Sequence, residues 1–481
     1  MSEARRYSKE SFIYVFGETL SKSLAFVLLP IYTNYLPLQE FAVLSLVTTL
    51  WPLVVVFLGA GFSAYLIRGY YEADDSRRFF GTLLGFSMLV GGVLATLIHL
   101  IGPWLCELVF DEVTYRPFLQ YAVYFAVFRL YFNHVVSCYR AKRQPRTAVL
   151  LSLVLFGTNL VAVLTAIYGL DAGLAGILNA QLLAYVLVAV VYTVKILPEL
   201  SFKPQWSVLV PAVLFVLPLV PHAFSGWVVN HVGKVFIETN MSLADLSVYS
   251  VAVQLAVILN VVNTGLNQAW TPFVYANYAA QDSAGLLGVS ARRTILLVLV
   301  VALALVLFTR ELLLLMGKEA YLAATRVLPV LVLGYLFQMV YFIFVAIILY
   351  NKRSVLLPLI SISSGLVTIG LNFVLVPRLG MFGAALSTDV AFFLMACLAF
   401  GFARRYRTLP ILNREMFWFL AAAVAVTWVS VTWLQELTLF WHVAVNLLLL
   451  LALGGLLVRL GLLNLQNIRD LIRGTRPFTF S

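Results

Sequence analysis

The strongest constraint on the fold of this chain is a series of long apolar segments that recurs from end to end. Each is close to the roughly 20 residues that an α-helix needs to cross a bilayer. Runs of this length, without the alternating polarity of membrane strands, indicate helices rather than a barrel. Fourteen such segments are predicted, at 11–36, 41–66, 80–102, 118–138, 147–168, 174–197, 207–233, 246–271, 293–315, 327–350, 355–376, 382–403, 417–435 and 441–463.

Composition supports the same conclusion. Of 481 residues, 62% are hydrophobic and 11% are charged, whereas soluble proteins carry roughly a quarter charged residues. This excludes a soluble enzyme and a disordered chain, and three cysteines are too few for a secreted disulfide scaffold. The sequence therefore predicts an all-α integral membrane protein with about 14 transmembrane helices.

The net charge of +11 sets the topology of the chain. With the N-terminus placed inside, 24 of the 32 Lys and Arg residues fall in inner connections and six in outer ones. Inner loops of membrane proteins are enriched in these residues. Both termini are therefore expected in the cytoplasm, and the basic balance is explained without nucleic acid.

An internal repeat divides the chain. Three short patterns recur in the same order and at nearly equal spacing, at Glu40 and Asp245, at Gly173 and Gly380, and at Asn159 and Asn372. Six helices per repeat is an even number, so the repeats are parallel and a binding site is expected between them. We predict an N-lobe over 1–198 and a C-lobe over 199–405 around a central cavity, two extra helices over 406–463, and a cytoplasmic amphipathic tail over 464–481.

Ionisable groups inside the hydrocarbon are costly, so each is a candidate functional residue. Glu18 and Lys22 lie four apart in the first segment, where Lys22 is expected to hold an anion and Glu18 to titrate with a coupling ion. A self-neutralising pair near the inner surface is the alternative. Arg129 lies half way along the fourth segment, too deep to reach the headgroups easily, and its planar fork suits phosphate oxygens. Asp389 is a candidate protonation site. The alternative for Arg129 is a structural ion pair with Asp389 or Glu18, and the alternative for Asp389 is a buried pair with Arg129.

Two further segments carry polar faces. Trp227, Asn230 and Lys234 fall within about 60° of one another on a helix, which suits a phosphorylated sugar, although Lys234 can also extend outward to the interface. Asn260, Asn263 and Asn267 form the amide part of a polar stripe. These amides are expected either to hydrogen-bond sugar hydroxyls or to join neighbouring helices.

The sequence contains no Gly-rich phosphate loop, catalytic triad, paired carboxylates or zinc-ligand spacing. We therefore expect no enzyme activity, no cofactor and no metal site.

Several stretches together resemble the bacterial polysaccharide-transport proteins. The first includes Phe-Val-Leu-Leu-Pro-Ile-Tyr-Thr-Asn-Tyr-Leu, and the set lies at 26–36, 61–72, 248–252, 267–273, 371–377 and 380–388. The chain is similar to the O-antigen (Wzx-type) flippases of the multidrug/oligosaccharidyl-lipid/polysaccharide exporter superfamily. The similarity spans nearly all of 7–405.

This resemblance implies two six-helix lobes around a cavity that opens alternately to each side of the bacterial inner membrane. It implies that an undecaprenyl-pyrophosphate-linked oligosaccharide moves from the cytoplasmic to the periplasmic leaflet, coupled to H⁺ or Na⁺. Membrane lipids, a polysaccharide polymerase and a chain-length regulator are the expected partners. Relatives that flip the peptidoglycan precursor carry cavity arginines on the first helix, where this sequence has Glu18 and Lys22, which makes that substrate less favoured.

Three other functions compete with a flippase. A drug/cation antiporter of the same superfamily would need an acidic rather than a cationic cavity. A membrane glycosyltransferase or polymerase would need a large outer loop, and the predicted outer loops are short. A scaffold protein would leave surface polysaccharide unchanged on deletion.

Overall fold

A computed structural model describes residues 26–59, 61–280, 283–411, 413–433 and 438–459. Within these ranges the chain is helical with short connections and contains no strand, so the predicted all-α class is confirmed. Residues 26–35 are helical. The other elements are α2 (Leu38–Leu58), α3 (Phe62–Gly69), α4 (Ser76–Val109), η1 (Tyr115–Leu119), α5 (Gln120–Ala141), α6 (Pro145–Leu164), η2 (Thr165–Gly169), α7 (Gly173–Ile196), η3 (Leu197–Glu199), α8 (Trp206–Val216), α9 (Leu219–Asn240), α10 (Leu243–Asn277), α11 (Ser283–Leu307), α12 (Thr309–Leu314), η4 (Glu319–Arg326), α13 (Leu328–Tyr350), α14 (Leu356–Leu379), α15 (Met381–Ala403), α16 (Arg414–Trp433) and α17 (Leu439–Arg459).

Eleven helical segments of the described chain are long and apolar enough to cross a membrane. Two of the other three predicted spans correspond to α5 and to α16. The third, 11–36, lies outside the described residues up to residue 25, and its residues 26–35 are helical. Within α5, Arg129, Asn133 and His134 interrupt the apolar sequence. A multi-pass membrane protein is therefore shown, while the count of fourteen spans stays a prediction.

The chain forms two compact units, which are described separately. Unit 1 contains the described residues up to Ser250 together with Ile369–Ala384, and unit 2 contains Val251–Thr368 and the described residues from Ala385 onward. Their boundaries fall inside α10, α14 and α15. The lobes predicted over 1–198 and 199–405 stay a prediction.

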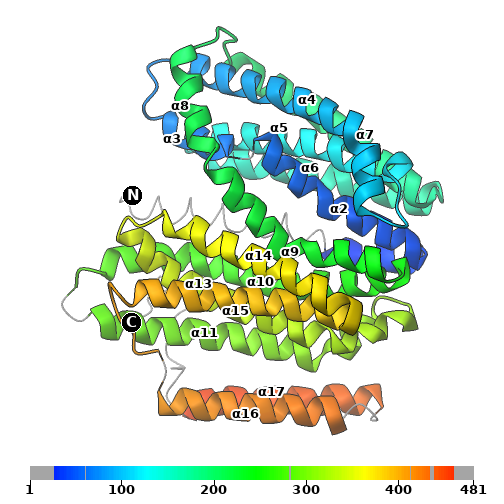
Figure 1. Cartoon of the computed structure of the whole chain (residues 1–481), viewed down its shortest axis with the longest axis vertical. Coiled ribbons are helices and arrows are strands. Elements are labelled where there is room, and N and C mark those ends of the chain that lie inside the picture. Colours follow the sequence, from blue (N-terminus) through cyan, green and yellow to red (C-terminus); the bar gives the residue numbers. More distant parts are fainter. Residues whose placement is uncertain (1–25, 60, 281–282, 412, 434–437, 460–481) are drawn as a thin grey trace. The chain divides into compact units, whose positions relative to one another are not determined.

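In unit 1, α2 is the element on which the others meet. It packs against α4, α5, α7 and α9 (Figure 1). Its contact with α9 is made by buried Trp227, Val228 and Val232, against which Leu50 and Leu53 of α2 pack. Two of the helices with predicted functional residues, α5 and α9, are thus held by the same partner.

In unit 2, α11 holds the two helices that follow the repeat. α16 and α17 pack on each other and on α11. Leu296 and Leu303 of α11 form one buried cluster with Phe419 of α16 and Leu453 of α17. In a membrane, close packing of such side chains rather than their removal from water joins helices, and this cluster joins the hairpin to α11.

The backbone repeats where the sequence does. Gly173 and Gly380, which belong to the same repeated pattern, both have a positive φ, of 60° and 58°. Arg143 and Lys352, at a closely similar spacing, also share a left-handed conformation, with φ of 54° and 58°. Positive φ is rare outside glycine, so equivalent helix ends in the two repeats are built in the same way.

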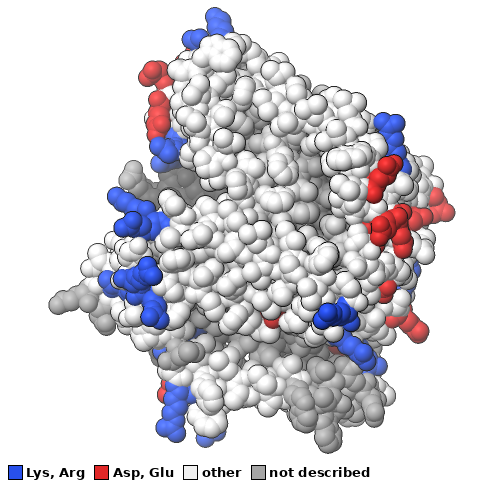
Figure 2. All heavy atoms as spheres, in the orientation of Figure 1, with Lys and Arg blue, Asp and Glu red and all other residues white. Residues whose placement is uncertain are grey.

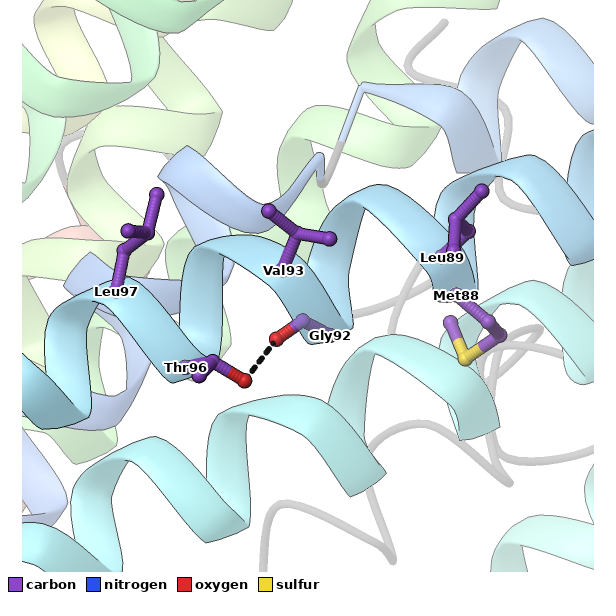
Figure 3. A pocket seen from close by; sticks show the side chains of 6 residues that line it. All are labelled: Met88, Leu89, Gly92, Val93, Thr96 and Leu97. Carbon is purple, nitrogen blue, oxygen red and sulfur yellow. Dashed lines mark hydrogen bonds between the residues drawn. The ribbon is translucent and has the colours of Figure 1, made fainter.

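One face of α4 has the character of a lipid-facing surface. A shallow groove of about 470 Å³ runs along it, lined by Met88, Leu89, Gly92, Val93, Thr96 and Leu97 (Figure 3). Leu89 is 67% exposed, and the hydroxyl of Thr96 donates to the carbonyl oxygen of Gly92 at 2.8 Å. Exposed apolar side chains and an internally satisfied hydroxyl are what hydrocarbon requires.

Gly81 provides a test of packing at the other end of α4. A Cβ at this position would lie 2.2 Å from the carbonyl oxygen of Ser201, and the amide of Ser201 donates to the carbonyl of Arg77. We expect Gly81→Ala to lower the stability of the detergent-purified protein by about 1–3 kcal/mol, measured by thermal unfolding. Gly92→Ala is the matched control, since a Cβ there meets nothing within 4 Å. Equal melting temperatures for the two variants would contradict the contact.

Candidate functional site

Arg129 lies on α5 between two aromatic rings. Its guanidinium carbon is 5.2 Å from the ring centroid of Trp51 on α2 and 5.3 Å from that of Tyr185 on α7. The contacts of α5 with α2 and α7 bring these three side chains together. The arginine predicted from the sequence therefore sits in a defined aromatic clamp.

The clamp orients the charge of Arg129 without neutralising it. No acidic side chain in the described part of the chain forms an ion pair with Arg129, and its buried Nε has no hydrogen-bond partner there. Cation–π contacts contribute roughly 0.5–2 kcal/mol, but the faces of the rings provide no conventional hydrogen-bond acceptor for the N–H groups. This geometry suits an oxyanion that approaches the guanidinium in plane.

Trp227, Asn230 and Lys234 lie along α9, and two of them contact α2. The indole N–H of Trp227 donates to the carbonyl of Thr49 at 2.8 Å, and Lys234 Nζ donates to Ser45 Oγ at 2.8 Å. Lys234 is only 7% exposed, so its amine is held inside unit 1. The half-buried Asn230 donates its amide to the carbonyl of Gly226 on its own helix, at 2.8 Å.

Lys234 adjoins a contact between equivalent positions of the repeat. Ser45 and Ser250, 205 residues apart, form a hydrogen bond of 2.7 Å between their hydroxyls. Lys234 donates to the same Ser45 oxygen. The buried ammonium therefore donates to Ser45, which in turn donates to Ser250, and both partners are neutral. Lys234 forms no ion pair among the described residues.

Arg129 and Lys234 do not meet on α2. Lys234 contacts Ser45, whereas Arg129 contacts Trp51, six residues further along. At 100° per residue these two positions point about 120° apart around the helix. The two cations thus occupy different faces of α2.

The amide stripe of α10 joins that helix to α13 in unit 2. Asn260 Nδ2 donates to Gln338 Oε1 at 3.0 Å. Asn263, fully buried, donates to the carbonyl of Tyr335 at 2.7 Å and to Gln338 Oε1 at 3.2 Å. Asn267 accepts a long hydrogen bond from Thr271, at 3.4 Å. The first two amides make the interhelical contacts that were the alternative interpretation of the stripe.

Asp389 is a buried carboxylate on α15. It is 8% exposed, and Oδ1 would lie 3.4 Å from a Cβ built on Gly334 of α13. Oδ1 has no hydrogen-bond partner and Asp389 forms no ion pair within the described chain. An ionised carboxylate in this setting is costly, which suits a group that gains and loses a proton or cation.

Glu18 and Lys22 lie outside the described residues, so their roles stay predictions.

The sequence interpretation did not identify Glu238, at the end of α9. Its carboxylate accepts hydrogen bonds from the backbone amides of Asp111, Glu112 and Val113, at 3.1, 2.9 and 3.0 Å. Glu238 is 1% exposed. In the sequence, Glu238 lies just past the predicted end of an apolar segment. A charged residue at such a position is usually part of a solvated loop, so the sequence alone offered no reason to select it.

The fold and these residues define a class of protein: a helical, multi-pass membrane protein with a buried lysine, a half-buried arginine and buried carboxylates within its helices. The solved structures that it resembles are membrane transporters. The lipid II flippase MurJ, in an inward closed conformation, has a TM-score of 0.71 at 12% identity, covering 93% of this chain and 99% of that one. A multidrug resistance MATE family transporter of the MOP superfamily, facing inward, has a TM-score of 0.64 at 16% identity, covering 80% and 94%. At these identities the similarity shows the fold.

Sequence comparison gives the family. Residues 8–277 match the family described as polysaccharide biosynthesis protein, and the chain belongs to that family. Two relatives from Haemophilus influenzae align with it. One, an uncharacterized membrane protein, is 23% identical over 274 residues, and the other, Lsg locus putative protein 1, is 24% identical over 275 residues. Each alignment covers 56% of this chain and 65% of the relative, which is less than two thirds of the relative's length.

Proposed function

We propose that the protein is a flippase that moves undecaprenyl-pyrophosphate-linked oligosaccharide from the cytoplasmic to the periplasmic leaflet of the bacterial inner membrane. Membership of the polysaccharide biosynthesis family and the transporter fold support this proposal. A diphosphate with several sugars cannot cross about 30 Å of hydrocarbon unaided. A protein path with fixed cations lowers that barrier.

The observation that carries the proposal is the aromatic clamp around Arg129. An anion-binding group is needed within a span, and Arg129 supplies a cation that no described acidic side chain neutralises. We assign Arg129 to the diphosphate. Lys22 and Lys234 are further proposed contacts for the anion, and Trp227, Asn230 and Asn267 for the sugars. Asn260 and Asn263, the other two predicted sugar contacts, already donate to Gln338 of α13, so they could reach a sugar only by exchanging those hydrogen bonds.

Transport is proposed to proceed by alternating access driven by H⁺ or Na⁺. Asp389 and Glu18 are the proposed coupling residues. The assignment of Asp389 is supported by its burial and by the lack of a described hydrogen-bond partner for its Oδ1. Both termini are proposed to be cytoplasmic. A polysaccharide polymerase and a chain-length regulator would then take the product on the other side.

Two alternatives use the same fold. A cation-coupled drug antiporter is favoured by one observation, the buried carboxylate of Asp389, and by the likeness to MATE structures. A flippase for the lipid-linked peptidoglycan precursor is favoured by the structural likeness to the lipid II flippase.

Reconstitution of the full chain distinguishes these functions. Vesicles would contain an undecaprenyl-pyrophosphate trisaccharide, lipid II or the fluorescent cation ethidium, under an imposed proton or sodium gradient. We expect the trisaccharide lipid to become inaccessible to an external glycosidase, and ethidium to stay evenly distributed. Protein-free vesicles and a gradient of equal size and opposite sign are the controls. Movement of ethidium alone would establish the antiporter, and movement of lipid II alone the precursor flippase.

A further inference from the structure

A basic pocket lies in unit 2, where α13 ends, α14 begins and α15 ends. Its volume is about 400 Å³. Lys352 and Arg353 line it from the α13–α14 connection, and Arg405 from the segment after α15, with Phe402 and Tyr406 beside them. Figure 2 shows Lys and Arg side chains gathered at the left-hand ends of these helices. Two separate connections thus bring three cations to one pocket.

The backbone that presents Lys352 and Arg353 is a specific helix ending. The amide of Arg353 donates to the carbonyl of Ile348, and the amide of Lys352 to that of Leu349. This is the Schellman pattern, in which the left-handed position usually holds glycine. Lys352 occupies that position, with φ of 58°, at a conformational cost of about 1 kcal/mol.

A single buried tyrosine ties the two connections together. The side-chain amide of Asn351 donates to the hydroxyl of Tyr278 at 3.0 Å, and the guanidinium carbon of Arg407 lies 4.4 Å from the centre of the same ring. Asn351 precedes Lys352, and Arg407 lies two positions after Arg405. The spacing between the pocket cations is therefore fixed by contacts that do not use the cations themselves.

The electrostatics of the pocket favour an anion. Its lining includes no acidic residue, and neither Lys352, Arg353 nor Arg405 forms an ion pair with any described side chain. The first turn of α14 starts at the pocket wall with Leu356. The positive end of this helix dipole adds to the potential of the three cations.

We propose that this pocket binds the headgroup phosphate of an anionic phospholipid of the bilayer. Its position favours a lipid over a soluble phosphate. Val355, which lines the pocket, is 83% exposed, and the predicted membrane span Leu356–Leu379 begins directly beside it. A phosphate held by the three cations would place its acyl chains along this apolar surface. The site is separate from the residues assigned to flipping, and it does not depend on that function.

The test uses full-length protein in detergent, titrated with short-chain phosphatidylglycerol and followed by native mass spectrometry. The pocket variant carries Lys352→Gln, Arg353→Gln and Arg405→Gln. Since hydrogen bonds to charged groups contribute about 1.5–3 kcal/mol each, we expect its affinity to fall at least about 100-fold. The matched control carries Arg77→Gln, Arg146→Gln and Lys203→Gln, which remove the same charge from predicted inner connections of unit 1, and it should bind as the wild type does.

Two further titrations distinguish an anionic phospholipid from other possible ligands of the pocket. Phosphatidylcholine should bind equally weakly to all three proteins, and millimolar inorganic pyrophosphate should leave bound phosphatidylglycerol in place. Equal losses in the pocket and control variants would overturn the site, because only overall charge would then matter. Displacement by pyrophosphate would overturn the lipid assignment in favour of a soluble phosphate. If the triple variant is not monodisperse, Arg405→Gln alone should lower the affinity about tenfold, and no change would overturn the proposal.

Discussion

Replacing Arg129 by glutamate should abolish lipid-linked oligosaccharide flipping in reconstituted vesicles, with a loss of at least about 100-fold. The faces of Trp51 and Tyr185, which hold the guanidinium at 5.2 and 5.3 Å, carry negative electrostatic potential. A carboxylate between them is therefore destabilised, and it repels a diphosphate. Flipping is measured from the protection of the trisaccharide lipid against an external glycosidase.

Graded substitutions show whether charge or shape matters at this position. Arg129→Lys should retain partial activity, because it keeps the charge but loses the planar fork. Arg129→Gln should lose most of it. Arg326→Glu is the matched control, since it reverses an exposed cation of η4 and should flip as the wild type does. Wild-type flipping by a well-folded Arg129→Glu protein would remove the main support for the flippase.

The same variants can be tested in cells. In a strain that lacks its own copy of this gene, Arg129→Glu should fail to restore surface polysaccharide at wild-type protein levels. Restoration would show that export of surface polysaccharide does not depend on the charge of Arg129.

The helical fold could be predicted because hydrocarbon imposes one periodicity and one length on every span. The first and last residues of each helix were harder to predict from the sequence. The predicted segment 80–102 is part of α4, which begins at Ser76 because the side chain of Asp75 accepts from the amides of Arg77 and Arg78. A hydropathy pattern detects apolar residues and passes over such a cap.

Polar helix ends explain a second difference. The predicted segment 207–233 is divided between α8 and α9, and α9 continues to Asn240. Lys234 and Glu238 therefore belong to a helix, although their charge resembles that of a loop. Their partners, the Ser45 hydroxyl and the amides of 111–113, lie far away in sequence.

The sequence could identify individual residues of the site, but not which residues lie together in the fold. A cation in the middle of an apolar segment identifies Arg129 because its burial is costly. Trp51 and Tyr185 lie on other helices, far from Arg129 in the sequence, and resemble any other aromatic residues of membrane helices. Only the packing of α5 against α2 and α7 shows them as its partners. For the amides of α10, the helical spacing favoured sugar binding over helix packing, whereas the acceptor on Gln338 shows a packing contact for Asn260 and Asn263.

Glu238 should be the most sensitive carboxylate for the stability of unit 1. In the native protein its two oxygens accept from three consecutive backbone amides in the connection between α4 and η1. Glu238→Ala removes the acceptor of all three amides, of which that of Val113 is buried, and an unsatisfied buried group costs about 1–3 kcal/mol. We expect a loss of about 1–3 kcal/mol, measured as a lower midpoint of thermal unfolding in detergent.

Glu238→Gln separates the charge from the shape of this contact. The amide keeps one acceptor oxygen but turns an NH₂ group toward an N–H donor, so its midpoint should fall between those of the wild type and Glu238→Ala. Glu112→Gln is the control, because it removes an exposed carboxyl from the same connection and leaves the backbone amide of residue 112 in place. If Glu238→Ala melts with the wild type, the three hydrogen bonds do not hold the connection. If its midpoint falls while flipping per folded molecule is unchanged, Glu238 acts in stability alone, as the contact geometry requires.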